Sequence, residues 1–246
     1  MSEEKINVDV LIVGAGPAGL TCAIRLMQAA KRQKKALQVM VLEKGGESGD
    51  HIISGAILNP VVLNELLPDW QASLGEFVTD VTQDKFYWLG ENRALRLPVV
   101  PDLHNKGNVI TSLSKVCRWL AKEAEALGVM VLSGFPAARL LYEGEQVVGV
   151  MTSESGLDKA GKKKSGFQEG TAVYAPVTVL AEGCRGHLTQ EVIAKFSLET
   201  QPQNYGIGLK EVWRVESANH QPGLVIHAAG WPLDARTYGG SFCYHW

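Results

Sequence analysis

The first 45 residues carry a pattern of apolar and polar positions that is typical of a βαβ unit. A nearly continuous apolar run over residues 8–13 indicates a strand buried on both faces of a parallel sheet. Apolar residues then recur at helical spacing over 20–27 and give way to a basic stretch at 31–35. A second apolar run, 37–42, ends at Glu43. The pattern therefore predicts a strand, a helix and a second strand with an acidic residue at its tip.

The pattern changes after residue 50. An apolar-rich segment with few charges covers 52–67, and the last forty residues mix Trp, Tyr, Gly and Pro. Between these segments we expect the following elements: a helix that begins after Thr111 or Ser112 and stops at Gly128, a strand over 129–132, an antiparallel hairpin of 138–142 and 147–152, a polar loop over 156–170, and a buried strand over 177–181.

A Gly-x-Gly-x-x-Gly turn joins the first predicted strand to the helix. Glycines at its three positions permit a tight turn, close approach of a pyrophosphate, and close packing of helix on strand. The helix N-terminus offers free N–H groups and a partial positive charge to phosphates. Glu43, 24 residues past the third glycine, is placed to accept hydrogen bonds from ribose hydroxyls and disfavours a 2′-phosphate. The turn predicts a dinucleotide site, with NADP the least expected dinucleotide.

This motif alone leaves NAD and FAD open. A nicotinamide-binding domain would continue with further βα units. Here a long irregular segment and a hairpin intervene before the chain returns to the sheet at 177–183. That layout matches flavoproteins in which an insertion builds a second domain over the flavin, so FAD is the expected cofactor.

Composition and charge exclude several classes of protein. The chain of 246 residues is 46% hydrophobic and has a net charge of −2, which gives no general attraction to nucleic acid. No apolar run approaches the ~20 residues of a spanning helix. The four cysteines are far apart, without the spacing of a metal site, and we expect free thiols. The N-terminus has no apolar signal region and is too acidic for a transit peptide, so we expect the chain to start in the cytoplasm.

Several motifs together resemble the electron-transfer flavoprotein–ubiquinone oxidoreductase family, and the resemblance runs along essentially the whole chain. The first motif below is shared by many flavoproteins, and the last ones are close to diagnostic. The motifs are Val13 to Leu20 (VGAGPAGL), 49–56 (GDHIISGA), 66–70 (LLPDW), 124–129 (AEALGV), 181–188 (AEGCRGHL), 205–211 (YGIGLKE), 230–233 (GWPL) and 238–242 (YGGSF).

The resemblance implies FAD, one 4Fe-4S cluster, and electron transport from reduced electron-transfer flavoprotein to membrane ubiquinone. It implies no catalytic side chain, since the cofactor carries the electrons. It places the quinone ring against Gly239 and Gly240. The residues that it places near FAD are Gly14, Ala15, Gly16, Pro17, Ala18, Gly19, Glu43, Lys44, Ser54, Gly55, Glu182 and Gly183.

The implied fold is α/β: a Rossmann-like, glutathione-reductase-like FAD domain with an inserted, partly antiparallel β domain for the quinone. Residues 1–200 would form the FAD domain and 201–246 the incomplete start of the ubiquinone domain. The apolar segment near 48–69 would touch one leaflet of the membrane without crossing it. A bacterial protein of this kind would lie on the cytoplasmic face of the inner membrane, and eukaryotic relatives on the mitochondrial inner membrane.

Two departures from the family pattern qualify these expectations. Lys106-Gly107-Asn108 stands where the family usually has His-Gly-Asn. The second flavin motif and the four clustered cysteines of the family do not occur in the sequence, so we expect a truncated chain without cluster ligands or turnover. The alternatives are an NAD(P)H-dependent flavoprotein reductase or monooxygenase of the same fold, and a non-catalytic FAD-binding fragment.

Overall fold

A computed structural model describes residues 5–53, 55–158, 162–199, 201–234 and 236–246. These residues form two compact units, each built from two stretches of chain. Unit 1 comprises 1–52 and 116–208, and unit 2 comprises 53–115 and 209–246. Each unit combines two separate stretches of chain, so the units do not test the domain boundary that we predict near residue 200, and that boundary stays a prediction.

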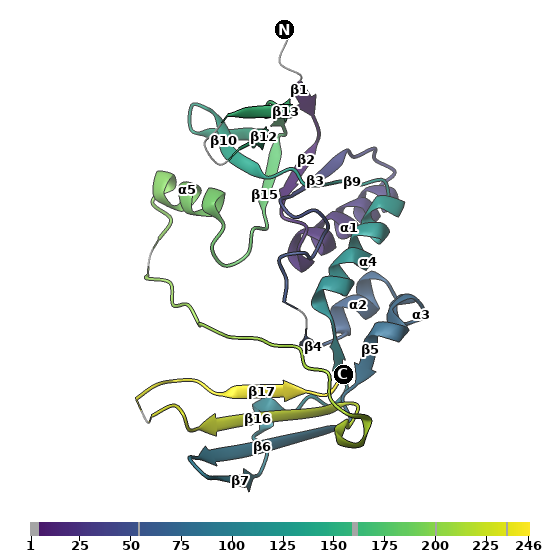
Figure 1. The fold of residues 1–246 in the computed structure, drawn as a ribbon. Helices are drawn as coiled ribbons and strands as arrows, with labels where there is room; N and C mark the ends of the chain where they lie inside the picture. Colours follow the sequence, from purple (N-terminus) through teal and green to yellow (C-terminus); the bar gives the residue numbers. More distant parts are fainter. Residues whose placement is uncertain (1–4, 54, 159–161, 200, 235) are drawn as a thin grey trace. The chain divides into compact units, whose positions relative to one another are not determined.

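A four-stranded parallel sheet forms the centre of unit 1 (Figure 1). Its order is β15 (Val177–Leu180), β2 (Val10–Val13), β3 (Val39–Glu43) and β9 (Met130–Ser133). Every residue of β2 and β3 is buried, as the apolar runs predict. Helix α1 (Pro17–Arg32) connects β2 to β3 and packs on both strands. The βαβ unit is present, and the predicted α/β fold is confirmed.

A second sheet of unit 1 has the order β1 (Lys5–Asn7), β14 (Ala172–Tyr174), β11 (Gln146–Thr152) and β10 (Ala137–Glu143). The hairpin β10–β11 lies where the sequence predicts it. Helix α5 (His187–Phe196) follows β15 and contributes Leu188 to the core. The core between the elements consists of Val8, Leu11, Val13, Met40, Leu42, Ala137, Leu140, Val150, Val173, Ala175 and Leu188.

The expectation of a polar loop over 156–170 is wrong. Strands β12 (Ser155–Leu157) and β13 (Lys163–Gln168) pair as an antiparallel ribbon. Next to these strands, the Lys162 backbone N–H donates to the Asp158 carboxylate at 2.8 Å, and the Lys163 ammonium lies 3.9 Å from the centre of the Phe167 ring. Backbone pairing and these local contacts stabilise strands whose side chains are mostly polar, so hydrophobic alternation gave no signal.

Unit 2 contains a small antiparallel sheet of β4 (Ala56–Leu58), β8 (Val109–Thr111) and β5 (Val78–Asp80). Helices α2 (Val61–Leu66) and α3 (Trp70–Leu74) follow β4, and a short 3-10 turn, η1 (Gly75–Phe77), leads into β5. Buried Trp70 anchors this part, because its indole N–H donates to the Asn64 side chain at 2.7 Å. The chain continues into unit 1 within helix α4 (Leu113–Ala126), which lies where the sequence predicts a helix.

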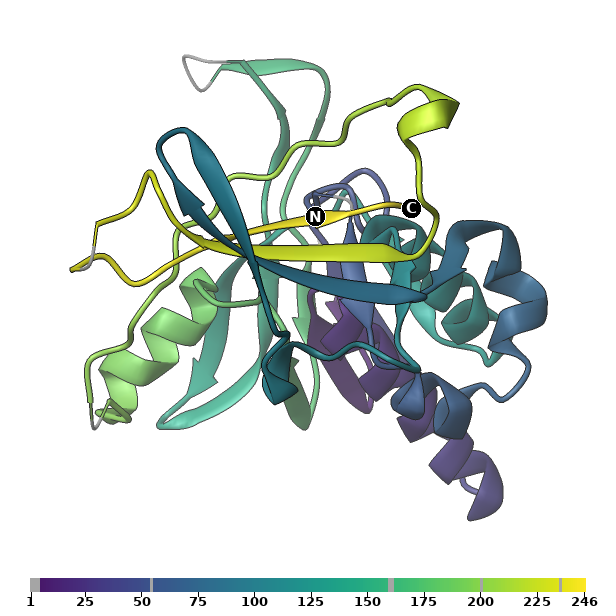
Figure 2. The same cartoon turned by 90° about the horizontal axis from the view of Figure 1, so that it is seen from below.

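A four-stranded sheet forms the rest of unit 2. Its order is β17 (Ser241–Tyr244), β16 (Leu224–Gly230), β6 (Gln83–Gly90) and β7 (Arg93–Leu97), with β16 parallel to β6 and the outer pairs antiparallel. Two views show the β6–β7 hairpin alongside β16 and β17 (Figures 1 and 2). Short 3-10 turns η2 (Pro101–Leu103) and η3 (Ser217–Asn219) lie in the connections.

Candidate functional site

The glycine turn lies at the carboxyl end of β2. Gly14 has φ +106°, and a Cβ there would lie 2.4 Å from the carbonyl oxygen of Ala181. A Cβ at Gly19 would lie 2.0 Å from the carbonyl oxygen of Gly14, whereas a Cβ at Gly16 would meet no atom within 4 Å. Gly14 and Gly19 are therefore required by the turn and the helix packing. Gly16 borders open space, which suits the close approach of a ligand.

The N-terminus of α1 presents free backbone donors beside this turn. The helix begins at Pro17, no side chain caps it, and its first turn holds no acidic residue. Proline at the first helical position lacks an N–H that would have no partner in the helix. The N–H groups of the first turn and the helix dipole favour a bound anion such as a pyrophosphate.

Glu43 ties the tip of β3 to the glycine turn. Its buried carboxylate accepts a hydrogen bond from the Ala15 backbone N–H at 2.9 Å and from the Gly45 backbone N–H at 2.7 Å. Each carboxylate oxygen has a second lone pair, so both remain able to accept from a ribose hydroxyl. The sequence placed Glu43 correctly at the strand tip, but it did not reveal that Glu43 also holds the turn in place.

The loop after Glu43 contains polar groups that the sequence analysis missed. Ser48 is buried, and its hydroxyl has no hydrogen-bond partner in the part of the chain that the structure describes. The Asp50 carboxylate accepts from the Glu47 backbone N–H at 2.8 Å and from the Arg118 guanidinium of α4 at 3.0 Å. Arg118 also lies 2.8 Å from the Glu47 carboxylate. Both the Glu47 N–H and Arg118 lower the pKa of Asp50. Asp50 and Arg118 are 68 residues apart in the chain, so no sequence motif indicates that they interact.

Glu182 follows β15 and performs a structural task next to the glycine turn. Its carboxylate accepts hydrogen bonds from the backbone N–H and the hydroxyl of Thr189, each at 2.8 Å, and so caps helix α5. His187 lies 3.5 Å from the same carboxylate. Gly183 has φ +82° and open space around the position of a Cβ. The carboxylate of Glu182 thus holds α5, while the cofactor role of Glu182 and Gly183 stays a prediction.

The structure brings part of the predicted FAD set together in unit 1. The turn 14–19, Glu43 and the Ala181–Gly183 segment meet at the carboxyl ends of β2, β3 and β15, and Lys44 is exposed beside them. Ser54 lies outside the described residues. Gly55 belongs to unit 2, where its carbonyl oxygen accepts from the Lys210 ammonium at 2.5 Å. Its role toward FAD stays a prediction.

Unit 2 contains a cavity of about 1120 Å³, which we call the unit 2 cavity. The aromatic side chains of Phe242 and Tyr244 stack there with ring centres 4.8 Å apart. The Lys210 ammonium lies 5.5 Å from the centre of the Phe242 ring. The cavity is lined by Gly55, Ile110, residues 209–215, His220 and residues 242–246. Its walls therefore combine aromatic rings with a few charged and polar groups, as in sites for small organic ligands.

The predicted quinone-contact residues Gly239 and Gly240 do not line this cavity. A Cβ at Gly240 would lie 2.5 Å from the carbonyl oxygen of Ala228. Packing against β16 is therefore sufficient to require glycine at this position, without any contact with a ligand. Their contact with a quinone stays a prediction.

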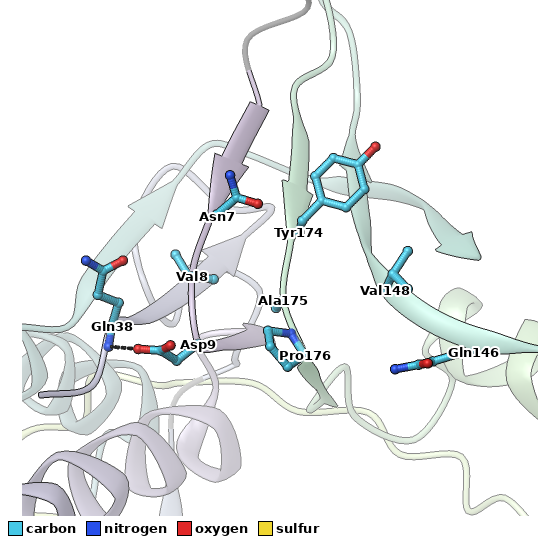
Figure 3. Close-up of a pocket in the computed structure, with 9 residues that line it drawn as sticks. All are labelled: Asn7, Val8, Asp9, Gln38, Gln146, Val148, Tyr174, Ala175 and Pro176. Carbon is cyan, nitrogen blue, oxygen red and sulfur yellow. Dashed lines mark hydrogen bonds between the residues drawn. The ribbon is translucent and has the colours of Figure 1, made fainter. Parts of the chain in front are cut away.

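A smaller hollow of about 470 Å³ lies at the amino ends of the strands of the unit 1 sheet (Figure 3). Asp9, Gln38 and Pro176, which line it, directly precede β2, β3 and β15. The Asp9 carboxylate already accepts from the Gln38 backbone N–H at 2.7 Å, as Figure 3 shows. The hollow therefore offers side-chain amides, the Tyr174 side chain and one engaged carboxylate, and it lies at the end of the sheet opposite the glycine turn.

The remaining features concern possible metal ligands, the cysteines and membrane-spanning helices. Within the described ranges, no three His, Cys, Asp or Glu side chains are grouped to hold a metal ion. Cys22, Cys117, Cys184 and Cys243 are free thiols, and burial raises the pKa of Cys117 to about 12. Among the described residues, no helix has the length and apolar character needed to span a bilayer.

Parallel strands with a glycine turn at their carboxyl ends and an acid on the neighbouring strand define a dinucleotide-binding protein of the Rossmann class. A family model for an NAD(P)-binding Rossmann-like domain matches residues 12–68. A second model, described as ETF-QO, ubiquinone-binding, matches residues 205–246.

Curated relatives are similar to the chain along nearly its whole length. Electron transfer flavoprotein–ubiquinone oxidoreductases from Dictyostelium discoideum and Pseudomonas aeruginosa are 49% and 46% identical to this chain over 96% and 100% of its length. The chain spans 40% and 46% of the length of these two relatives. It is thus related over its whole length to the electron transfer flavoprotein–ubiquinone oxidoreductases, which confirms the resemblance that the motifs indicated.

Solved structures show the same fold at low sequence identity. A geranylgeranyl bacteriochlorophyll reductase-like protein from Thermoplasma acidophilum has a TM-score of 0.58 at 19% identity, covering 93% of this chain and 51% of that one. The myxobacterial chondrochloren halogenase CndH, described as FAD-dependent, has a TM-score of 0.54 at 19% identity, covering 75% of this chain and 39% of that one.

Proposed function

We propose that this chain carries the FAD-binding turn and part of the quinone site of an oxidoreductase that passes electrons from reduced electron-transfer flavoprotein to ubiquinone. One observation carries the proposal. The residues that line most of the unit 2 cavity, 209–215 and 242–246, lie inside the match to the ubiquinone-binding family model. The glycine turn of unit 1 supplies the accompanying nucleotide site.

FAD fits the residues present at the turn. The N–H groups at the start of α1 would hold the pyrophosphate, with Gly16 leaving space for it. Glu43 would accept from the adenosine ribose, and the unpartnered Ser48 hydroxyl offers one more hydrogen bond in the same loop. Bound FAD supplies the electron-transfer chemistry, and the chain supplies binding and orientation. No side chain is required to act as an acid or a nucleophile.

The iron–sulfur cluster of the family does not fit the described part of this chain. Its cysteines are not grouped, and burial keeps the Cys117 thiol protonated by raising its pKa. A 4Fe-4S cluster needs four thiolates at one place. We therefore assign the cluster no ligand among these residues and no role in what they do.

We further propose a monotopic membrane contact within 48–69, where the structure separates two kinds of apolar residue. Leu63 and Leu66 are buried in unit 2, whereas Ile53, Val61 and Val62 are about 60% exposed. Ile57 and Leu58, which the apolar pattern also offered, are half-buried and pair with β8. The exposed side chains are the ones available to a leaflet. A bacterial protein would make this contact on the cytoplasmic face of the inner membrane.

The test uses the purified full-length protein and three additions. Flavin absorbance should be present, reduced electron-transfer flavoprotein should bleach it, and a short-chain ubiquinone should restore it. Rapid bleaching by NADH or NADPH, with no response to the flavoprotein, would instead establish the reductase or monooxygenase alternative. Bound flavin that neither the reduced flavoprotein nor NAD(P)H bleaches would establish the non-catalytic FAD-binding fragment, and absence of flavin from protein supplied with FAD would overturn the proposed FAD site.

A further inference from the structure

Gly134 and Phe135 continue the chain from β9 along the tip of β3. Ser133, the last residue of β9, pairs with Glu43 in the parallel sheet. Beyond this pair, the Gly134 backbone N–H donates to the Gly45 carbonyl oxygen at 2.7 Å, and the Phe135 backbone N–H donates to the Glu43 carbonyl oxygen at 2.9 Å. These two hydrogen bonds hold the segment 134–135 directly beside the acid that we propose to accept from the ribose.

Both residues of the segment 134–135 leave room for a ligand. Gly134 has φ +80°, and a Cβ there would meet no atom within 4 Å. Phe135 is 43% exposed, whereas every residue of neighbouring β3 is buried. An aromatic side chain that is held by its backbone and left uncovered gains apolar burial when a flat ligand lies on it. The segment therefore offers an apolar surface beside open space at the carboxyl end of the sheet.

The order of the strands predicts which part of a dinucleotide reaches this segment. The sheet runs β15, β2, β3, β9, with the glycine turn for the pyrophosphate after β2 and Glu43 for the ribose at the tip of β3. Neighbouring strands lie about 4.8 Å apart, and adenine is joined directly to the ribose. A nucleotide that runs from β2 across β3 therefore brings its base to the end of β9. The flavin, attached at the other end of the pyrophosphate, extends toward β15.

We propose that Phe135 binds the adenine ring of FAD against its aromatic side chain, with Gly134 leaving space for the base. This inference rests on the FAD site proposed above. The phenyl ring and the purine are both flat and aromatic, so their contact removes area from water without requiring a polar partner. Phe135 lies outside the glycine motif, and its role follows from the pairing of β9 with β3.

The first test compares variants of the full-length apoprotein in FAD titrations. Phe135→Ala removes the ring and should weaken FAD binding at least about fivefold, the lower end of the range for a base stacked on an aromatic side chain. Phe135→Tyr keeps the ring and should retain the affinity. Phe196→Ala removes another phenylalanine of unit 1, 36% exposed on α5, and should have no effect. Failure of the unaltered protein to bind FAD would overturn the proposed FAD site, whereas equal binding by Phe135→Ala would overturn the adenine contact alone.

The second test is spectroscopic and uses ADP, which carries adenine and ribose but no flavin and should compete with FAD. In deuterated apoprotein with protonated phenylalanine rings, saturation of those rings should be transferred to H2 and H8 of the bound adenine. The transfer should fall sharply in Phe135→Leu, which keeps an apolar side chain but lacks the ring, and should persist in Phe196→Leu. Equal transfer in Phe135→Leu and the unaltered protein, or ADP that does not compete with FAD, would overturn the assignment.

Discussion

Replacement of Glu43 by glutamine is the sharpest perturbation of the nucleotide site. The two side chains have almost the same size, but glutamine has one accepting oxygen where glutamate has two. In the structure, the two oxygens accept from Ala15 N–H at 2.9 Å and from Gly45 N–H at 2.7 Å. In the variant, one of these donors must face the amide NH₂ group, which cannot accept.

The expected cost follows from these two contacts. A hydrogen bond to a charged acceptor contributes about 1.5–3 kcal/mol, and the site is buried, so water does not replace the lost acceptor. The same loss removes one position at which a ribose hydroxyl can be held. We therefore expect FAD affinity to fall about 10- to 100-fold, and the free energy of unfolding of the apoprotein to fall by about 1–3 kcal/mol.

The assay is a fluorescence titration of the apoprotein with FAD, accompanied by thermal unfolding of the same samples. Glu47→Gln is the matched control, because Glu47 lies in the same loop with its side chain 68% exposed. It should change affinity by no more than about fivefold. Glu43→Gln protein that unfolds at a lower temperature yet binds FAD as tightly as the unaltered protein would show that Glu43 only holds the loop and that the ribose lies elsewhere.

Three further predictions concern other parts of the molecule. Arg118→Met removes the exposed contacts of α4 with Glu47 and Asp50 and should weaken FAD binding no more than about fivefold, an effect that high salt should reproduce in the unaltered protein. Val61→Asp together with Val62→Asp should release the protein from liposomes in a flotation assay while its flavin absorbance is retained; unchanged flotation would place the membrane contact elsewhere. Burial and the charges of His220 and Lys85 lower the pKa of His245, so the contribution of its neutral form to stability is complete above the unfolded pKa of about 6.5 and is lost as pH falls through the folded pKa. Chemical denaturation at pH 7 and pH 5 should therefore show a smaller loss of stability for His245→Gln than for the unaltered protein, and equal losses would contradict the lowered pKa.

The parts of the fold that the sequence predicted correctly are those with dense local signals. Strands β2 and β3 are buried on both faces, so their apolar runs are continuous and easy to recognise. Helix α4 carries an apolar stripe and is followed by Gly128 at φ +94°, a conformation that favours glycine at a helix end. The β10–β11 hairpin turns at Gly144, also at positive φ. In each case, residues close in sequence determine the structure.

The missed elements depend on partners far along the chain. Strand β6 is eight residues long, yet most of its side chains are only half-buried, and it pairs with β16 some 140 residues later. Neighbouring β7 is almost wholly exposed, so its composition resembles that of a loop. The Arg118 contacts in the nucleotide loop also join residues that no motif connects. Pairing across the fold, rather than burial, determines these features.

Glu43 and Glu182 show how site and scaffold share the same side chains. Glu43 ends β3 and Glu182 follows β15; both strands neighbour β2 in the sheet, and the resemblance assigned both acids to the cofactor. In the structure, each carboxylate accepts backbone N–H groups from another segment: Glu43 from the glycine turn, and Glu182 from the start of α5. Substitution of either acid must therefore change the shape of the loop before it changes a contact with a ligand. Affinity and stability measured on the same variant are needed to separate the two roles. Because the Glu182 carboxylate is engaged by α5, Glu182→Gln should lower stability but should change FAD affinity less than Glu43→Gln does.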